Sequence, residues 1–78
     1  MDMKKIQVSN RKNGATVWTV LNNSAVCADI EKDYRFFDGK EYDVIFHGKL
    51  VGSGYTKKSE AIARAKKILR DYIKKMEG

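Results

Sequence analysis

The side chains best suited to chemistry in this sequence are cations, and they gather in its last third. Residues 56–76 include a row of basic residues at i,i+4 spacing, Lys66, Arg70 and Lys74, with Lys67 beside it. A helix turns about 100° per residue, so this row would form a ridge along one helical flank. Like charges at this spacing repel one another and cost a few tenths of a kcal/mol per pair. The ridge therefore indicates an anionic partner, although basic residues also keep small proteins soluble.

Two further lysines, Lys57 and Lys58, stand where this helix is expected to begin. The first turn of a helix presents free backbone N–H groups and the positive end of its dipole, which attract phosphate. Tyr55 precedes them and would either stack on a base of a single-stranded partner or hold its turn against the core. The candidate nucleic-acid-binding residues are therefore Tyr55, Lys57, Lys58, Lys66, Lys67, Arg70 and Lys74.

Catalytic or metal chemistry has little support in the residues present. His47 is the only histidine and stands beside a glycine in a predicted turn, where a surface imidazole is expected. Cys27 has no partner in the sequence that would activate it, so a buried or half-buried structural thiol is expected. Asp29, Glu31 and Asp33 alternate along one segment, which favours a solvated strand edge over a metal site. No glycine pattern matches a phosphate-binding loop. The sequence thus predicts no enzyme, no cofactor and no metal.

Composition limits the class of protein. The 78 residues are 42% hydrophobic, enough for one small domain spanning residues 1–78. Sixteen lysines and arginines against ten acidic residues give a formal net charge of +6, which favours polyanionic partners. The longest apolar run, Val44–Phe46, is too short to span a bilayer, and no signal-type apolar block follows the first lysines. A single cysteine excludes an internal disulfide, so we expect a cytoplasmic protein.

The first two thirds of the chain read as short strands separated by turns. Residues 15–21 (ATVWTVL) are β-branched and aromatic, the strongest strand signal in the chain. Trp18 shares a side with Thr16 and Val20 and is expected to anchor the core. The other expected strands are Lys4–Ser9, Lys40–Phe46 and the short Leu50–Val51 that dissolves into Gly52-Ser53-Gly54. The expected turns are Asn10–Gly14, Asn22–Ser24, Asp38–Gly39 and His47–Lys49.

Residues 25–37 fit two structures. Apolar and polar residues alternate through most of the segment, which favours a strand with a break near Glu31–Asp33. A helix with Ser24 as its N-cap is the alternative. Its apolar stripe would consist of Val26, Ile30, Tyr34 and Phe37.

The last third predicts one long amphipathic helix, capped by Thr56 or Ser59. Its apolar face would consist of Ala61, Ala65, Ile68, Leu69, Tyr72 and Met76, widened by Ile62 and Ile73. A sheet with one apolar face needs such a cover. The expected fold class is therefore α+β: an antiparallel meander of four to five strands, covered on one face by the C-terminal helix.

Residues 42–69 carry a resemblance to known families. The segment reads as a strand, a glycine turn, Gly52-x-Gly54, then Thr56-Lys57-Lys58 leading into an alanine-rich basic helix. This order resembles the C-terminal half of double-stranded-RNA-binding domains. It is also similar to the three-stranded-sheet-plus-helix DNA-binding domains at the N-terminus of some phage-type integrases. The resemblance implies a sheet-plus-helix fold and, from the first family, phosphate contacts by Lys57 and Lys58.

These observations predict a small basic, non-enzymatic binding module that contacts the backbone of DNA or RNA through its C-terminal helix. The alternative is a phage-type inhibitor, anti-CRISPR or anti-restriction-like, that binds a host defence or transcription protein. Such an inhibitor would place the helix flank or the edge strand Lys4–Ser9 against an acidic protein surface. The sequence leaves both open, and it specifies no oligomeric state.

Overall fold

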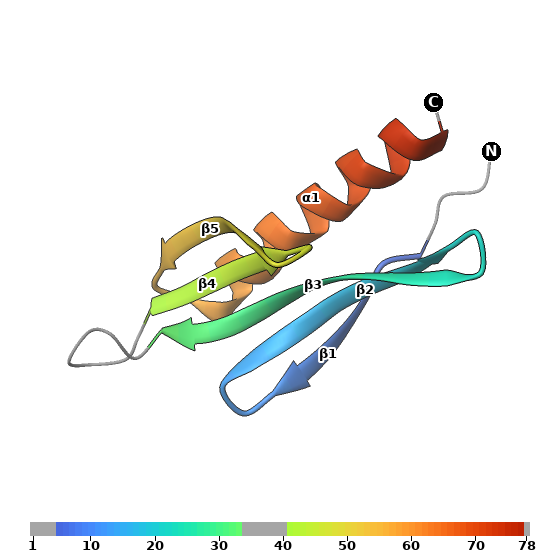
Figure 1. Cartoon of the computed structure of the whole chain (residues 1–78). Coiled ribbons are helices and arrows are strands. Elements are labelled where there is room, and N and C mark those ends of the chain that lie inside the picture. The colour runs from blue at the N-terminus through green and yellow to red at the C-terminus, as the bar shows by residue number, and fades with distance from the viewer. Residues whose placement is uncertain (1–4, 34–40, 78) are drawn as a thin grey trace.

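The chain forms one antiparallel sheet with a long helix across one face (Figure 1). The computed structural model describes residues 5–33 and 41–77. The strands follow one another as a meander in the order β1-β2-β3-β4-β5. They are β1 (Gln7–Arg11), β2 (Gly14–Leu21), β3 (Ser24–Asp33), β4 (Glu41–Phe46) and β5 (Lys49–Tyr55), followed by α1 (Lys58–Glu77). The expected α+β fold class is confirmed.

Two of the hairpin turns depend on a left-handed backbone. Asn22 and Asn23 join β2 to β3 with φ angles of 53° and 66°, and His47 and Gly48 join β4 to β5 with 52° and 75°. Two consecutive positive φ angles twist a two-residue turn in the same sense as its strands. Asparagine, histidine and glycine are the residue types that adopt this region most readily.

The first hairpin differs from the expectation. Its turn consists of Lys12 and Asn13 alone, and Gly14 already belongs to β2 without a positive φ angle. Gly14 is required for another reason: a Cβ there would collide with the backbone carbonyl of Ile30 on β3. The expected turn at Asp38–Gly39 lies outside the described residues.

The core lies between the sheet and α1. Its fully buried members are Ala15, Val17, Ala28, Ile30, Val44, Ala61, Ala65 and Leu69. As expected, Tyr42, Val44 and Phe46 share the covered face, and Ile6 and Val8 pack against the same core. Alanines on both layers allow the helix to approach the sheet closely. No helix in the described ranges has the length and apolarity needed to cross a bilayer.

Trp18 does not anchor this core, contrary to the expectation. The odd-numbered residues of β2, including Val17 and Thr19, point under the helix, and Trp18 points to the uncovered face. There it is half-buried, and its indole N–H donates a hydrogen bond of 3.2 Å to the Ser9 hydroxyl. Val20 on the same side is 50% exposed. The small side chains of β2 face α1 because a tryptophan would hold the helix away from the sheet.

The ambiguous segment is a strand as far as it is described. β3 runs without interruption through Asp33, paired with β2 on one side and β4 on the other, so the helical alternative and the break at Glu31–Asp33 are wrong. Residues 34–37 lie outside the described ranges. Cys27 points to the uncovered face opposite Trp18 and is exposed, so the expected burial of its thiol is also wrong. β5 likewise continues through its glycines to Tyr55, with a register irregularity against β4.

The helix begins one residue after Lys57. The Lys57 carbonyl accepts bonds from the N–H groups of Glu60 and Ala61, which makes Lys57 the N-cap in place of Thr56 or Ser59. The buried stripe of α1 consists of Ala61, Ala65, Leu69 and Ile73, flanked by half-buried Ile62, Ile68 and Tyr72. Met76 was expected on this face but is 56% exposed, because the last turn of α1 extends past β4 and β5 (Figure 1).

Candidate nucleic-acid interface

The outer surface of α1 carries the basic ridge of Lys66, Arg70 and Lys74. Arg70 and Lys74 are exposed and Lys66 is half-buried. On the opposite flank, the guanidinium of Arg64 donates a hydrogen bond of 3.4 Å to the Val51 carbonyl, so that flank faces β5. The side chains of Arg64 and Lys66 lie roughly 160° apart around the helix. Lys66 therefore lies on the flank of α1 remote from β5, and Arg70 and Lys74 follow it in turn toward the outer face, where the exposed Lys67 lies beside them.

The cations of the ridge have no partners within the described part of the chain. No hydrogen bond or ion pair there involves the side chain of Lys66, Lys67, Arg70 or Lys74. Their charges thus contribute little to the fold, and their mutual repulsion opposes helix formation slightly. These four residues form a basic surface on α1 in which Lys66 is half-buried and the other three are exposed.

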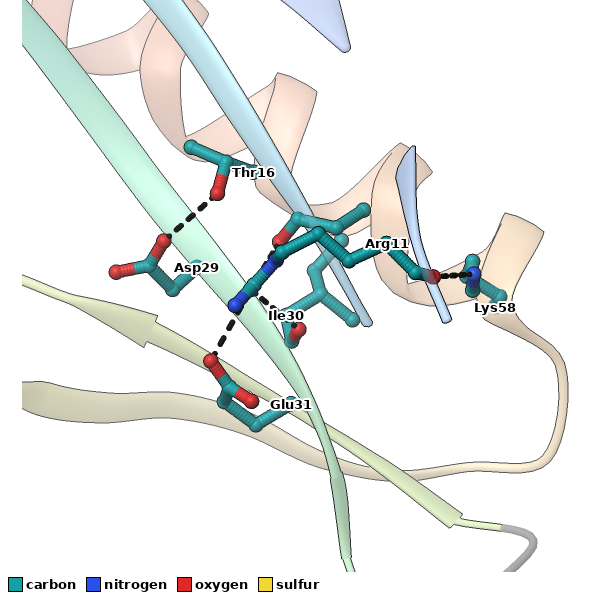
Figure 2. A network of polar contacts seen from close by, with 7 residues as sticks. Arg11, Thr16, Asp29, Ile30, Glu31 and Lys58 are labelled. Atoms are coloured by element: carbon teal, nitrogen blue, oxygen red, sulfur yellow. Dashed lines mark hydrogen bonds and ion pairs between the residues drawn. The ribbon is translucent and has the colours of Figure 1, made fainter. Parts of the chain in front are cut away.

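The two candidates before the helix have different surroundings. The ammonium of Lys58 donates a hydrogen bond of 2.8 Å to the Arg11 carbonyl, which ties the start of α1 to the first hairpin (Figure 2). Lys57 is exposed at the N-cap. The structure therefore leaves Lys57 accessible beside the helix start, while Lys58 holds two elements together.

Tyr55 belongs to the packing of the sheet. It pairs with Tyr42 across β4 and β5, is half-buried, and packs against the core. A Cβ on Gly52 would lie 3.0 Å from its ring, so the glycine leaves room for the tyrosine. Of the two roles that the sequence allowed, these contacts favour the one in which Tyr55 holds its turn against the core.

On the uncovered face of the sheet, unlike on the ridge, charged side chains bond to other groups of the protein (Figure 2). The Nη2 group of Arg11 donates to the backbone carbonyls of Ala15 at 3.1 Å and Ile30 at 3.2 Å. It also lies 3.0 Å from a carboxylate oxygen of Glu31. Arg11 reaches these three acceptors by lying over Gly14, whose missing side chain leaves the space. The guanidinium therefore ties β1, β2 and β3 together.

Acidic residues of β3 and β4 share this face. The Thr16 hydroxyl donates a hydrogen bond of 3.1 Å to Asp29. Farther along β3, the register sets Glu31 opposite Asp43. The expected solvated edge is found at Glu31, whereas Asp33 is buried. Within the described ranges, no group of three histidine, cysteine or acidic residues could hold a metal ion. The sheet face is thus acidic at this end, and the outer face of α1 is basic.

One surface cluster was not expected from the sequence. The ring of His47 stacks on that of Phe46 with centroids 4.0 Å apart and planes 18° from parallel. Tyr72 of α1 approaches both rings edge-on, at 5.4 Å from Phe46 and 5.5 Å from His47. The contact joins residues 25 positions apart, which no local pattern reveals. The only local signal was an aromatic residue followed by histidine at a tight turn.

Comparison with family models, with curated proteins and with solved structures gives no match to this chain.

Proposed function

We propose that this protein is a small, non-enzymatic nucleic-acid-binding module that contacts the phosphate backbone with the outer surface of α1. The observation that carries the proposal is the basic ridge of Lys66, Arg70 and Lys74, which has no internal partner among the described residues. Surface cations elsewhere in the fold, such as Arg11 and Lys58, are engaged in hydrogen bonds within the protein. Within the described ranges the side chains of the ridge residues make no such bond, and the three follow one another along α1, so they can neutralise an external anion together.

The spacing of the ridge suits a polyanion. Successive i,i+4 residues rise about 6 Å along a helix, so the three cations rise roughly 12 Å along α1 while turning about 80° around its axis. Phosphates along a nucleic acid are also regularly spaced, and each neutralised phosphate releases condensed counterions. Such contacts position the protein on the backbone without reading base sequence.

The distribution of charge supports one orientation. The acidic residues Asp29 and Glu31 lie on the uncovered face of the sheet, on the far side of the core from α1. A polyanion is therefore attracted to the helix side and repelled from the sheet side. Binding would place α1, with Lys67 and Lys57 at its margins, against the nucleic acid.

The proposal is tested by the salt dependence of duplex binding. Fluorescence anisotropy of a labelled DNA duplex is measured between about 50 and 200 mM salt, for the parent and for a variant with Lys66, Arg70 and Lys74 all changed to Gln. Three neutralised phosphates contribute about −2.7 to the slope of log K against log salt, or roughly 40-fold in affinity over this range. The ridge variant should lose that contribution and weaken different sequences about equally.

A matched control removes charges elsewhere. Lys5 and Lys12 are exposed and lie outside α1. Changing both to Gln gives the same net charge as a ridge variant with only Arg70 and Lys74 changed to Gln, but should keep most of the slope, whereas that ridge variant should lose about 1.8 of it. Equal losses in both variants would mean that net charge alone drives binding. If the parent binds no nucleic acid at about 50 mM salt, the proposal is wrong, and a pull-down comparing parent and ridge variant would then test an acidic protein partner.

A further inference from the structure

Phe46, His47 and Tyr72 form a three-ring unit where the β4–β5 turn meets α1. Phe46 is half-buried at the edge of the core, and His47 is the exposed outer member of the stack. Tyr72 comes from the helix and is half-buried. The unit therefore has a packed inner side and one ring presented to solvent.

The three distances place Tyr72 beside the stack. Its centroid is nearly equidistant from Phe46 and His47, at 5.4 and 5.5 Å, and its plane is inclined 75° and 90° to theirs. A ring covering the outer face of His47 would lie much nearer to His47 than to Phe46. Because Tyr72 is at the side, it steadies both rings and leaves the outer face of the imidazole open. In the part of the chain that is described, no other ring contacts His47.

The backbone holds this ring in place. His47 has a φ angle of 52° at the first position of the two-residue turn, a region that side chains other than glycine adopt uncommonly. Asparagine would satisfy the same turn at less cost. Contacts with Phe46 and Tyr72 restrict the imidazole further, so little side-chain freedom remains to be lost when a ligand stacks on it.

Cations border the unit. Lys49 pairs with Phe46 across β4 and β5, so it lies on the same face of the sheet, and it is exposed. Lys75 is exposed and lies one helical turn beyond Tyr72. A flat ring with an open face, bordered by lysines, matches a flat base attached to a phosphate.

We propose that the outer face of His47 stacks on an unpaired base, so that the protein prefers single-stranded nucleic acid to a fully paired duplex. This deepens, and rests on, the phosphate binding proposed for α1. Inside a duplex each base face is already covered by its neighbours, so no face is available for His47 to stack on. In a single strand the base faces are accessible, and stacking tolerates any base because each has a π-face.

The direct test uses the fact that His47 is the only histidine in the sequence. Its imidazole C–H protons give isolated resonances in a proton NMR spectrum of the whole protein. A base stacked on the ring shifts these resonances upfield through its ring current. Adding a short oligodeoxyadenylate should produce that shift, and adding a fully paired, blunt-ended DNA duplex should not. Binding of the oligodeoxyadenylate without movement of the His47 resonances overturns the platform and leaves phosphate binding by α1 intact.

Variants provide the second test. His47→Asn removes the ring but suits the left-handed turn, so the fold should persist, as circular dichroism would verify. Stacking on one base typically contributes enough that its loss weakens binding about 5- to 140-fold. We expect that loss for the single strand and an unchanged affinity for the duplex. His47→Tyr restores a flat ring and should restore the preference.

A matched control removes an aromatic ring from the other face. Trp18→Thr on the uncovered face should leave both affinities unchanged. Equal weakening of both probes by His47→Asn, or no weakening of either, contradicts the platform. A parent that binds neither probe contradicts the platform and the proposed function together.

Discussion

The outer face of α1 and the uncovered face of the sheet both carry many charges, and they use them differently. On the sheet, Arg11 contacts two carbonyls and Glu31, and Asp29 accepts a bond from Thr16. On the helix, the ridge cations have no partner in the described part of the chain. The comparison shows that similar side chains serve the fold on one surface and remain available to a ligand on the other.

The largest loss of stability should come from a change in the core between α1 and the sheet. Leu69 on α1 is fully buried against the sheet, so Leu69→Ala should lower the free energy of unfolding by about 2–5 kcal/mol. Truncation of Trp18 to alanine should cost less, about 1 kcal/mol, because this side chain is only half-buried on the uncovered face. Urea unfolding followed by circular dichroism measures both. A larger loss for Trp18→Ala than for Leu69→Ala would mean that the uncovered face has a packed core of its own.

The next largest loss of stability is expected at Gly14, which leaves the space that the Arg11 side chain occupies on the sheet. Gly14→Ala places a Cβ against the Ile30 carbonyl and near the Arg11 guanidinium, so two strands must separate locally. We expect a loss of about 3 kcal/mol in unfolding free energy, at the upper end of overpacking effects. Gly48→Ala is a useful contrast, because its Cβ would meet no atom within 4 Å and only its φ of 75° is unfavourable. Gly48→Ala should therefore be the milder change.

Smaller losses of stability should distinguish the hydrogen bonds of Arg11 to backbone carbonyls from its ion pair with Glu31. Arg11→Ala removes donors from two part-buried carbonyls and should cost about 1–2 kcal/mol. Glu31→Gln removes only the ion pair, whose side chains are 46% and 48% exposed, and should cost under about 0.5 kcal/mol. If the two changes cost the same, the ion pair and not the carbonyl contacts is what ties the strands together.

The smallest effect is expected on the helix. The ridge variant, with Lys66, Arg70 and Lys74 changed to Gln, should keep or slightly increase the free energy of unfolding, by a few tenths of a kcal/mol. The reason is that mutual repulsion is removed and no internal bond is lost. Thermal unfolding compared with the parent measures this. A clear drop in stability would show that the ridge serves the fold, and the contrast between the two faces would disappear.

The elements of this fold could be predicted from local patterns. The β-branched and aromatic composition of residues 15–21, the turn at Asn22–Asn23 and the helical stripe of Ala61, Ala65 and Leu69 each depend on neighbours close in sequence. The positions of the ridge cations on one helical flank follow from helical periodicity in the same way. These features need no knowledge of the rest of the chain.

The face that each strand turns to the helix could not be predicted as readily. Residues 15–21 offer two plausible apolar sides, one with Val17 and Leu21 and the other with Trp18 and Val20. Size suggested that Trp18 was in the core. The structure selects the smaller set, because the alanines of α1 approach the sheet closely and a large ring would not fit between them. Cys27 on β3 is exposed for the same reason: it is paired with Trp18, so it lies on the same uncovered face of the sheet.

By itself, the sequence determined the order of the elements, the amphipathic helix and its basic flank, because these depend on backbone preferences and on side-chain period. Only the tertiary structure decided which cations bond within the described part of the chain: Lys58 donates to the Arg11 carbonyl, and the side chains of Lys66, Arg70 and Lys74 have no partner there. It also brought Tyr72 to His47. Such contacts join residues far apart in the chain, and they exist only once the packing of helix on sheet has set the distances between them.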